Sequence, residues 1–422
     1  MNEVFLKVVN MSIAASWIVL AMLVLRLLLK KAPGWISVLL WGIVAVRLIC
    51  PFSFESALSL MPTTETIPLN IEMDYSPAID SGVNVINNVI NPVLSASLTP
   101  HPGDSCNPLQ IWIPFASVLW IVGITWMLLY SIVSCLRLHR RTAAAVRCRD
   151  NIFRTEQISS PFVFGIIRPR IYLPFSLQEP EMSHVIAHES SHIRRGDHWW
   201  KSLGFLLLTI HWFNPLMWLA YMLLCRDIEF ACDEKVIRGL DSKQRADYCQ
   251  ALVSCSVSPR TMTACPLAYG EVGVKQRVKS VMNYQKPAVW IILMSVAACI
   301  VISVCFLTNP VQDSFGLRIT VPAGNQNEIA YTHEEICPLG NYITVTAGEG
   351  LGDTEVLLKP AGSETETSFD EPAYLTPGMP VKMEAEKGHW FQIGVKLQNP
   401  ADEEQTVYIN VENVEVRISD EQ

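Results

Sequence analysis

Four long apolar segments constrain this chain more than any other feature of its sequence. A bilayer core of about 30 Å is crossed by roughly 20 apolar residues in a helix, and the four segments approach or exceed that length. They are residues 4–29, 35–52, 111–136 and 288–308. Half of the 422 residues are hydrophobic and only 17% are charged, which is unusual for a soluble protein. We therefore predict an α-helical polytopic membrane protein.

Basic residues beside these segments indicate their orientation, because Lys and Arg gather on the cytoplasmic side of membrane helices. Lys30 and Lys31 follow the first segment, and three arginines follow the third within residues 137–141. The C-terminal ends of the first and third segments should then be cytoplasmic, which places the N-terminus of the chain outside. The predicted order is transmembrane helices 1 and 2 in 1–53, an external loop 54–108, helix 3 in 109–136, a cytoplasmic domain 137–287, helix 4 in 288–308 and an external domain 309–422.

The C-terminal region differs from the rest in both charge and pattern. Residues 310–422 hold 20 Asp or Glu against 6 Lys or Arg, a net charge of −14, whereas the whole chain carries only −8. Short runs of period-2 alternation, separated by Gly, Pro, Asn and Asp, indicate strands. These runs are 317–321, 342–346, 355–358, 381–385, 390–397, 405–411 and 414–418. They predict an external all-β sandwich.

Twelve cysteines do not form an evident disulfide framework, since most fall in helices or in the cytoplasmic part, where thiols stay reduced. Cys106 and Cys337 are the two clearly external ones. They could pair, but spacing alone cannot establish a disulfide.

The predicted cytoplasmic domain mixes strands and helices. Residues 151–174 are rich in β-branched and aromatic residues broken by Gly165 and Pro169, which indicates strands. Residues 181–199 then follow helical periodicity, as do 227–240 and 242–258. Between them, the apolar run 203–224 is interrupted by Pro215, which favours a broken, membrane-seated hairpin over a clean span.

One motif in this domain carries chemistry. His188 and His192 are one helical turn apart, so their imidazoles can bind the same zinc ion, which is usually held by three protein ligands in a catalytic site. Glu189 is placed to take a proton from zinc-bound water and deliver it to the leaving amine. The third ligand is predicted to be Glu229, and Asp233, one turn further on, could accept the free N–H of a ligating histidine.

Other polar residues near the motif have simpler interpretations. The two motif histidines themselves could be core residues bonded to backbone carbonyls. His184 is more typical of a neighbour than of a ligand, and Asp197 fits a charge partner for Arg194 or Arg195 equally well. Three more polar residues could contribute to the site or be buried groups satisfied by backbone: His198, His211 and Asn214.

Four stretches together resemble the BlaR/MecR-type antirepressor metallopeptidases, over about residues 1–308. They are SPFVFGIIRPRIYLP, HESSHIRRGDHWW, HWFNPLMWLAYMLLCRDIEFACDEKV and VKQRVKSVMNYQKP. The resemblance implies a gluzincin-like α+β peptidase domain that binds one Zn²⁺ per chain through His188, His192 and Glu229, with Glu189 as general base. It also implies that an extended substrate peptide docks on the strand at Phe162, Val163, Phe164 and Gly165 by strand addition.

The same resemblance implies a regulatory role in the bacterial plasma membrane. An external signal from the envelope or an antibiotic would activate the peptidase, which would cleave a cytoplasmic transcriptional repressor and, in some members, itself. The expected partners are that repressor, membrane lipid and an unidentified external ligand, without direct contact to nucleic acid; a homodimer is compatible with this role. No serine of the C-terminal region has Lys three positions later, so acylation by β-lactams is not expected.

Two other functions remain open on the sequence. A housekeeping membrane protease of the prenyl-protein or heat-shock type also combines His-Glu-x-x-His with a later Glu, although the external β domain argues against it. A receptor without peptidase activity would signal by contact alone, but every expected metal residue is present.

Overall fold

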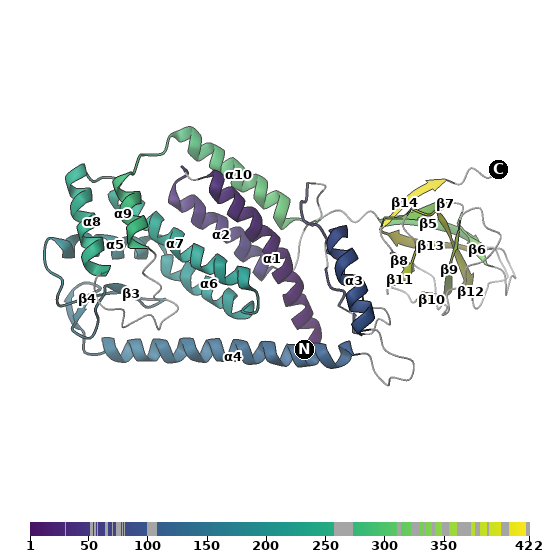
Figure 1. Ribbon diagram of the computed structural model, residues 1–422, viewed down its shortest axis with the longest axis horizontal. Helices are drawn as coiled ribbons and strands as arrows, with labels where there is room; N and C mark the ends of the chain where they lie inside the picture. The colour runs from purple at the N-terminus through teal and green to yellow at the C-terminus, as the bar shows by residue number, and fades with distance from the viewer. Residues whose placement is uncertain are drawn as a thin grey trace. The chain divides into compact units, whose positions relative to one another are not determined.

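The computed structural model divides into two compact units, Met1–Pro310 and Val311–Gln422, both drawn in Figure 1. It describes residues 1–29, 31–50, 108–256 and 273–309, residues 54–98 with scattered gaps, and the strands between 314 and 418 with gaps between them. Cys106 lies outside the described residues, so the structure does not test a disulfide between Cys106 and Cys337.

Three of the described helices are long and apolar enough to cross a membrane. They are α1 (Asn2–Leu28), α4 (Leu109–Thr142) and α10 (Val289–Leu307). The second predicted span coincides with α2 (Gly34–Ile49), which is apolar but has only 16 residues. At a rise of 1.5 Å per residue it extends about 24 Å, less than the bilayer core of about 30 Å. A further helix, α3 (Asn84–Leu98), precedes α4.

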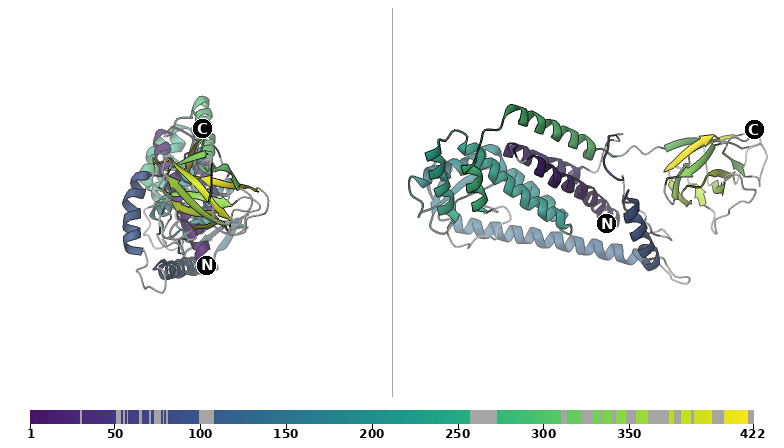
Figure 2. Two further views of the ribbon diagram at one scale, coloured as in Figure 1. Left: turned by 90° about the vertical axis from the view of Figure 1, so that its right-hand side faces the viewer. Right: turned by 45° about the horizontal axis from the view of Figure 1, so that its top comes forward.

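The apolar run in the middle of the chain forms a helical hairpin that packs among these helices. Its arms are α6 (Asp197–Ile210) and α7 (Pro215–Ile237). Residues of both arms share one buried core with α1 and α2, and the helices run side by side in both Figure 1 and Figure 2. The turn is held by Asn214, whose Oδ1 accepts the Leu216 N–H at 2.9 Å and so caps α7. The hairpin therefore joins the apolar helices to the polar half of α7.

A small mixed sheet lies at the other end of this unit. Its strands are β1 (Val146–Arg149), β2 (Ile152–Thr155), β3 (Phe162–Phe164) and β4 (Arg170–Pro174), in the order β1-β2-β4-β3. Helix α5 (Glu181–Arg195) packs against the sheet, α8 (Ser242–Ser256) packs against α5, and α9 (Val274–Met282) packs against α8. Ile171 and Leu173 of β4 share a buried cluster with Val185 of α5, which fixes α5 against the sheet.

The helix predicted over 181–199 is divided in two, which the sequence pattern does not indicate. Gly196 adopts a left-handed conformation with φ +70°, and its N–H bonds back to the last turn of α5. Glycine takes this conformation without steric cost, so it ends α5 and lets α6 start in a new direction at Asp197. The helix predicted over 227–240 is instead the second half of the longer α7.

The C-terminal unit consists of two antiparallel sheets that share one apolar core. One sheet has the order β10-β9-β12-β7-β14, with β6 paired to β12, and the other has the order β11-β8-β13-β5. Buried residues of both sheets, such as Ile393 and Ile409, belong to the same cluster. This agrees with the predicted all-β region. The strands are β5 (Ser314–Val321), β6 (Ala330–Tyr331), β7 (Glu334–Pro338), β8 (Tyr342–Ala347), β9 (Thr354–Pro360), β10 (Ala373–Leu375), β11 (Pro380–Glu384), β12 (Phe391–Leu397), β13 (Gln405–Glu412) and β14 (Val414–Ile418).

Candidate metal centre

Three side chains from two helices converge on one point. His188 and His192 come from α5, and their Nε2 atoms are 3.1 Å apart. Glu229 comes from α7, and its two carboxylate oxygens lie 3.5 Å from His188 Nε2 and 3.6 Å from His192 Nε2. These separations suit three ligand atoms around a zinc ion with bonds of about 2.0–2.2 Å. The donor set therefore fits a divalent metal of the zinc type.

Each of the two histidines has a polar partner on its other ring nitrogen. His192 Nδ1 lies 2.7 Å from Asp197 Oδ2. His188 Nδ1 lies 2.8 Å from the Tyr248 hydroxyl and 3.3 Å from Asp233 Oδ1, and Tyr248 donates to that same Asp233 oxygen at 2.6 Å. Partners of this kind keep the Nδ1 proton in place, which leaves the Nε2 lone pair free for a metal.

Two cations hold Glu229 in its ionised form. Lys201 Nζ lies 2.9 Å from one carboxylate oxygen and Arg277 Nη1 lies 3.3 Å from the other. Burial by itself would raise the pKa of Glu229, but the positive charges of Lys201 and Arg277 outweigh it and hold the pKa well below its ordinary value. Burial likewise opposes the charge of Asp233, yet its bonds to Arg277 lower the pKa of that carboxyl to about 2. Both acids are thus ionised at neutral pH.

Cys232 offers a second, different donor at this centre. Its sulfur lies within 4.8 Å of the ligand atoms of both histidines, so the three residues could also hold a metal. The sulfur, however, lies within hydrogen-bond distance of His188 Nδ1, at 3.6 Å. This is the side of the ring where the Tyr248 hydroxyl also lies. The Glu229 oxygens approach both Nε2 atoms. We therefore propose Glu229, rather than Cys232, as the third ligand.

Glu189 follows the first histidine on α5 and is only 8% exposed. In the described parts of the chain, no hydrogen bond or ion pair joins its carboxylate to another residue. A buried carboxylate without a fixed partner is available to accept a proton from a water molecule in the site. Its assignment as general base stays a prediction.

The predicted substrate-binding residues lie at the edge of the small sheet. Phe162, Val163 and Phe164 form β3, and Gly165 follows with φ +112°. Among the described strands, β3 pairs only with β4, which leaves its other edge open. Helix α5 packs against β3, so this edge belongs to the same part of the fold as the paired histidines.

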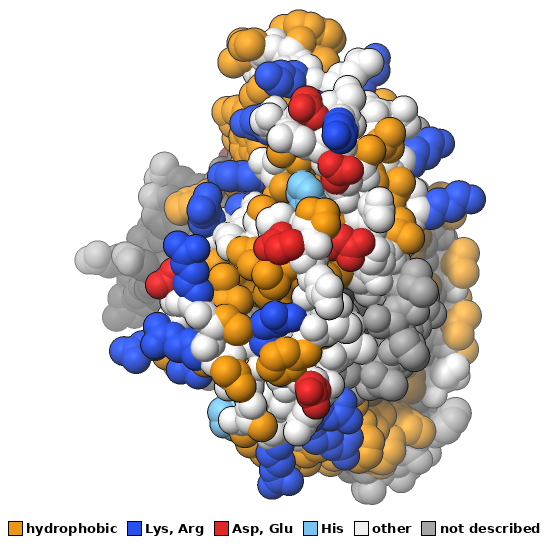
Figure 3. All heavy atoms as spheres, turned by 90° about the vertical axis from the view of Figure 1, so that its left-hand side faces the viewer, with side chains coloured by type: hydrophobic (Ala, Val, Ile, Leu, Met, Phe, Trp, Pro, Cys, Tyr) orange, Lys and Arg blue, Asp and Glu red, His pale blue; other side chains and the backbone are white. Residues whose placement is uncertain are grey.

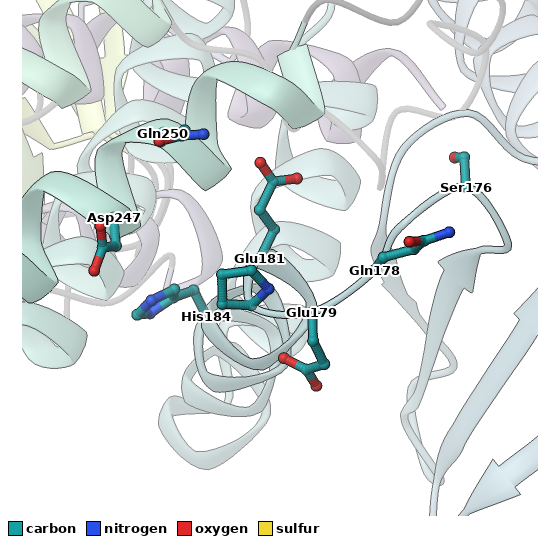
Figure 4. A pocket seen from close by; sticks show the side chains of 8 residues that line it. Ser176, Gln178, Glu179, Glu181, His184, Asp247 and Gln250 are labelled. Carbon is teal, nitrogen blue, oxygen red and sulfur yellow. The ribbon is translucent and has the colours of Figure 1, made fainter.

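A separate pocket of about 270 Å³ opens at the N-terminal end of α5. Glu181 and His184 contribute from α5, and Asp247 and Gln250 approach from α8 (Figure 4). None of the three proposed ligands lines it. His184, one turn before His188, thus faces this pocket and packs edge-on against the Tyr248 ring at 6.2 Å between centroids.

The remaining polar candidates take varied positions. Asn214 bonds to Ser12 and Ser16 of α1 and caps α7, so its contacts are structural. Asp197 contacts Arg195 at 3.2 Å, as the sequence suggested, but also His192, a contact that the sequence did not indicate. Burial lowers the pKa of His198.

Four further residues of the centre were not predicted. Lys201 comes from α6, Cys232 from α7, Tyr248 from α8 and Arg277 from α9. Cys232 and Arg277 lay in stretches singled out by their sequence, HWFNPLMWLAYMLLCRDIEFACDEKV and VKQRVKSVMNYQKP. Lys201 and Tyr248 lay in none of the four stretches, because their role depends on which helices pack together.

The chain is similar to known proteins of one family. Residues 6–281 match the profile of the BlaR1 peptidase M56 family. The chain is 29% identical over 194 residues to the regulatory protein BlaR1 of Bacillus licheniformis, which is 40% of this chain and 32% of that protein. It is 27% identical over 138 residues to the methicillin resistance mecR1 protein of Staphylococcus aureus, which is 31% of this chain and 24% of that protein.

The matched regions thus span about a third or less of the length of these relatives. The family match, in contrast, covers more than half of this chain and includes α5, α7, α8 and nearly all of α9. The resemblance drawn from the four sequence stretches is confirmed: the chain belongs to the BlaR1 peptidase M56 family.

Proposed function

We propose that this protein is a membrane zinc endopeptidase that transmits a signal by cleaving another protein. His188, His192 and Glu229 would hold one Zn²⁺ per chain in a gluzincin-like site, and Asp233 would support His188 through its Nδ1. The observation that carries this proposal is the convergence of both Nε2 atoms and the Glu229 carboxylate, within 3.1–3.6 Å of one another, in a family of metallopeptidases.

The residues around the centre suit peptide hydrolysis. A zinc ion bound there would activate water and polarise a peptide carbonyl. Glu189 would accept the proton of the attacking water and donate it to the leaving amine, because a partner-free carboxylate can serve first as base and then as acid. The open edge of β3 would bind the substrate backbone as an added strand, which holds the scissile peptide extended.

The predicted topology gives the peptidase a place in signalling. The N-terminus and the acidic β unit would be external, and residues 137–287 cytoplasmic. Figure 3 shows one face of the molecule, on which Lys and Arg side chains are spread widely, as expected for a cytoplasmic surface. Exposed basic residues of this segment include Arg147, Arg149, Arg168, Arg170 and Lys243.

The names of the relatives suggest what the signal controls, since one is a regulatory protein and the other a methicillin resistance protein. We infer that the substrate is a cytoplasmic transcriptional repressor, with cleavage of the chain itself as a second reaction. An envelope or antibiotic signal would act through the external unit. The protein would contact membrane lipid but not nucleic acid, and a homodimer would suit activation across the membrane.

Replacement of the general base tests the proposal. In cells that carry the chain and its repressor, Glu189→Ala should abolish repressor cleavage while the purified variant keeps its zinc and its thermal stability. Glu181→Ala is a matched control, because Glu181 lies on the same helix outside the metal centre. Unchanged cleavage by a folded Glu189→Ala variant would reject peptidase activity and favour a receptor that signals by contact.

A housekeeping protease would give a different pattern. Its cleavage of membrane substrates would not depend on the external unit or on an antibiotic, whereas the proposed sensor should cleave only after the signal. Comparing cleavage with and without an inducing antibiotic in the same cells separates the two.

A further inference from the structure

A buried arginine of α9 connects the two acidic residues that α7 contributes to the metal centre. Arg277 is only 6% exposed. Its Nε donates to Asp233 Oδ2 and its Nη2 donates to Asp233 Oδ1, both at 2.7 Å. Its remaining nitrogen, Nη1, lies 3.3 Å from Glu229 Oε2. Nη2 also lies 3.3 Å from His188 Nε2. One guanidinium therefore contacts two proposed zinc ligands, Glu229 and His188, and the carboxylate that supports His188.

The packing of α9 places the Arg277 side chain in the interior of the protein. Helix α9 contacts α7 and α8, and its Val281 is buried in a cluster with Ile237 of α7 and Tyr248 of α8. The two lysines on either side of Arg277, Lys275 and Lys279, are exposed. Of these three basic residues, only Arg277 enters the protein. Burying a cation is costly unless it is paired, so its place requires the two carboxylates.

Asp233 is shared among several groups, which makes its orientation critical. It accepts two bonds from Arg277 and one from the Tyr248 hydroxyl, and it lies 3.3 Å from His188 Nδ1. Without the guanidinium, a buried carboxylate would lose its strongest bonds and would be free to turn or to take up a proton.

We propose that Arg277 is a positioning residue of the metal centre: it holds Asp233 against His188 and Glu229 toward both Nε2 atoms. This inference rests on the proposed zinc peptidase function and adds to it the residue that sets the ligand geometry. An arginine suits the task because its planar fork bonds to both oxygens of Asp233 while a third nitrogen reaches Glu229. Lysine has one ammonium group and cannot hold both carboxylates in this way.

Metal binding by the purified full-length chain tests the role without any peptidase assay. Zinc affinity is measured by competition with a chelator, and the visible absorption spectrum of the Co²⁺-substituted protein reports the ligand geometry. Arg277→Met should weaken zinc binding roughly 10–100-fold, the range found when outer partners of metal ligands are removed, and should shift the cobalt bands. Lys279→Met, an equal change on the exposed side of α9, should alter neither.

Two further variants keep the inference falsifiable if Arg277→Met fails to fold. Arg277→Lys keeps the charge and should restore part of the affinity but not the wild-type cobalt spectrum. Because Arg277 acts through Asp233, combining Arg277→Lys with Asp233→Asn should weaken zinc binding by less than the product of the two single effects.

Three outcomes would overturn the role of Arg277. They are a folded Arg277 variant with wild-type zinc affinity and cobalt spectrum, a variant that binds zinc more tightly, and effects of Arg277→Lys and Asp233→Asn that multiply fully. A wild-type chain that binds no zinc is a separate failure, because it rejects the proposed function itself.

Discussion

Asp197 and His192 form the shortest ring-nitrogen contact of the candidate metal centre, at 2.7 Å. Asp197 opens α6 directly after Gly196, so the left-handed turn that ends α5 also brings this carboxylate back to the histidine. We expect Asp197→Ala to weaken zinc binding about 10–100-fold, because the His192 ring loses the partner that fixes it. Chelator competition measures the change, and Asp247→Ala, at an exposed aspartate of α8, should leave the affinity unaltered.

Single substitutions at Glu229 and Cys232 distinguish an oxygen from a sulfur as the third zinc ligand. Glu229→Ala should remove stoichiometric zinc from the purified chain, since two histidines alone do not complete the usual set of three ligands. Cys232→Ala should keep the metal, because the sulfur approaches His188 from its Nδ1 side. Metal analysis of both variants checks this. Zinc retained by Glu229→Ala and lost by Cys232→Ala would reverse the assignment.

The residues nearest in sequence were the ones that could be predicted. His188 and His192 are related by the i, i+4 spacing of a helix, and Glu229 and Asp233 repeat that spacing on a second helix. The partners on the outer side of these residues have no such local rule. Tyr248 and Arg277 arrive from helices 60 or more residues beyond His188, and only the packing of α8 and α9 brings them in.

At the level of elements, α7 joins the metal centre to the apolar helices. The same helix that carries Glu229 holds Asp227, which pairs with Arg26 of α1 and accepts the Trp41 indole N–H of α2 at 2.9 Å. Glu234 accepts the backbone N–H of Gly34 at 2.6 Å, at the start of α2. Polar contacts to α1 and α2 thus lie on both sides of Glu229 along α7.

The close approach of α2 to α7 at Gly34 gives a test of this connection. A Cβ on Gly34 would lie 2.8 Å from the Ala231 Cα, which is closer than real contacts allow. Gly34→Ala should therefore separate the helices, lower stability by roughly 1–3 kcal/mol and weaken zinc binding. Thermal unfolding in detergent and chelator competition measure the two effects. Gly239→Ala adds a methyl group with nothing within 4 Å and is the matched control; equal behaviour of the two variants would contradict the proposed connection.

Element boundaries were predicted less well than element types. The break at Gly196 was missed because the apolar periodicity continues past it, whereas the hairpin at 211–214 was expected from Pro215. In the β unit, each of the seven predicted runs overlaps a strand, but β6, β7 and β10 were not predicted. The two-residue β6 and three-residue β10 are too short to show alternation, and β7 ends in Cys337 and Pro338, which weaken a strand pattern.

At the scale of the whole molecule, the predicted topology puts residues 137–287, the peptidase part, in the cytoplasm and residues 309–422 outside the cell. Cys148 is exposed at the start of the peptidase part, and Tyr374 is 47% exposed on β10. In intact cells carrying the Tyr374→Cys variant, a membrane-impermeant maleimide should label residue 374 and spare Cys148. Permeabilised cells should show both labelled by peptide mapping. Labelling of Cys148 in intact cells would contradict a cytoplasmic peptidase domain.

The metal centre remains the claim on which the other conclusions depend, and X-ray absorption at the zinc edge of the purified chain tests it most directly. We predict about one zinc per chain, with nitrogen and oxygen ligands at about 2.0–2.2 Å and no sulfur. Absence of stoichiometric zinc, or a sulfur ligand at about 2.3 Å, would contradict the site built from His188, His192 and Glu229.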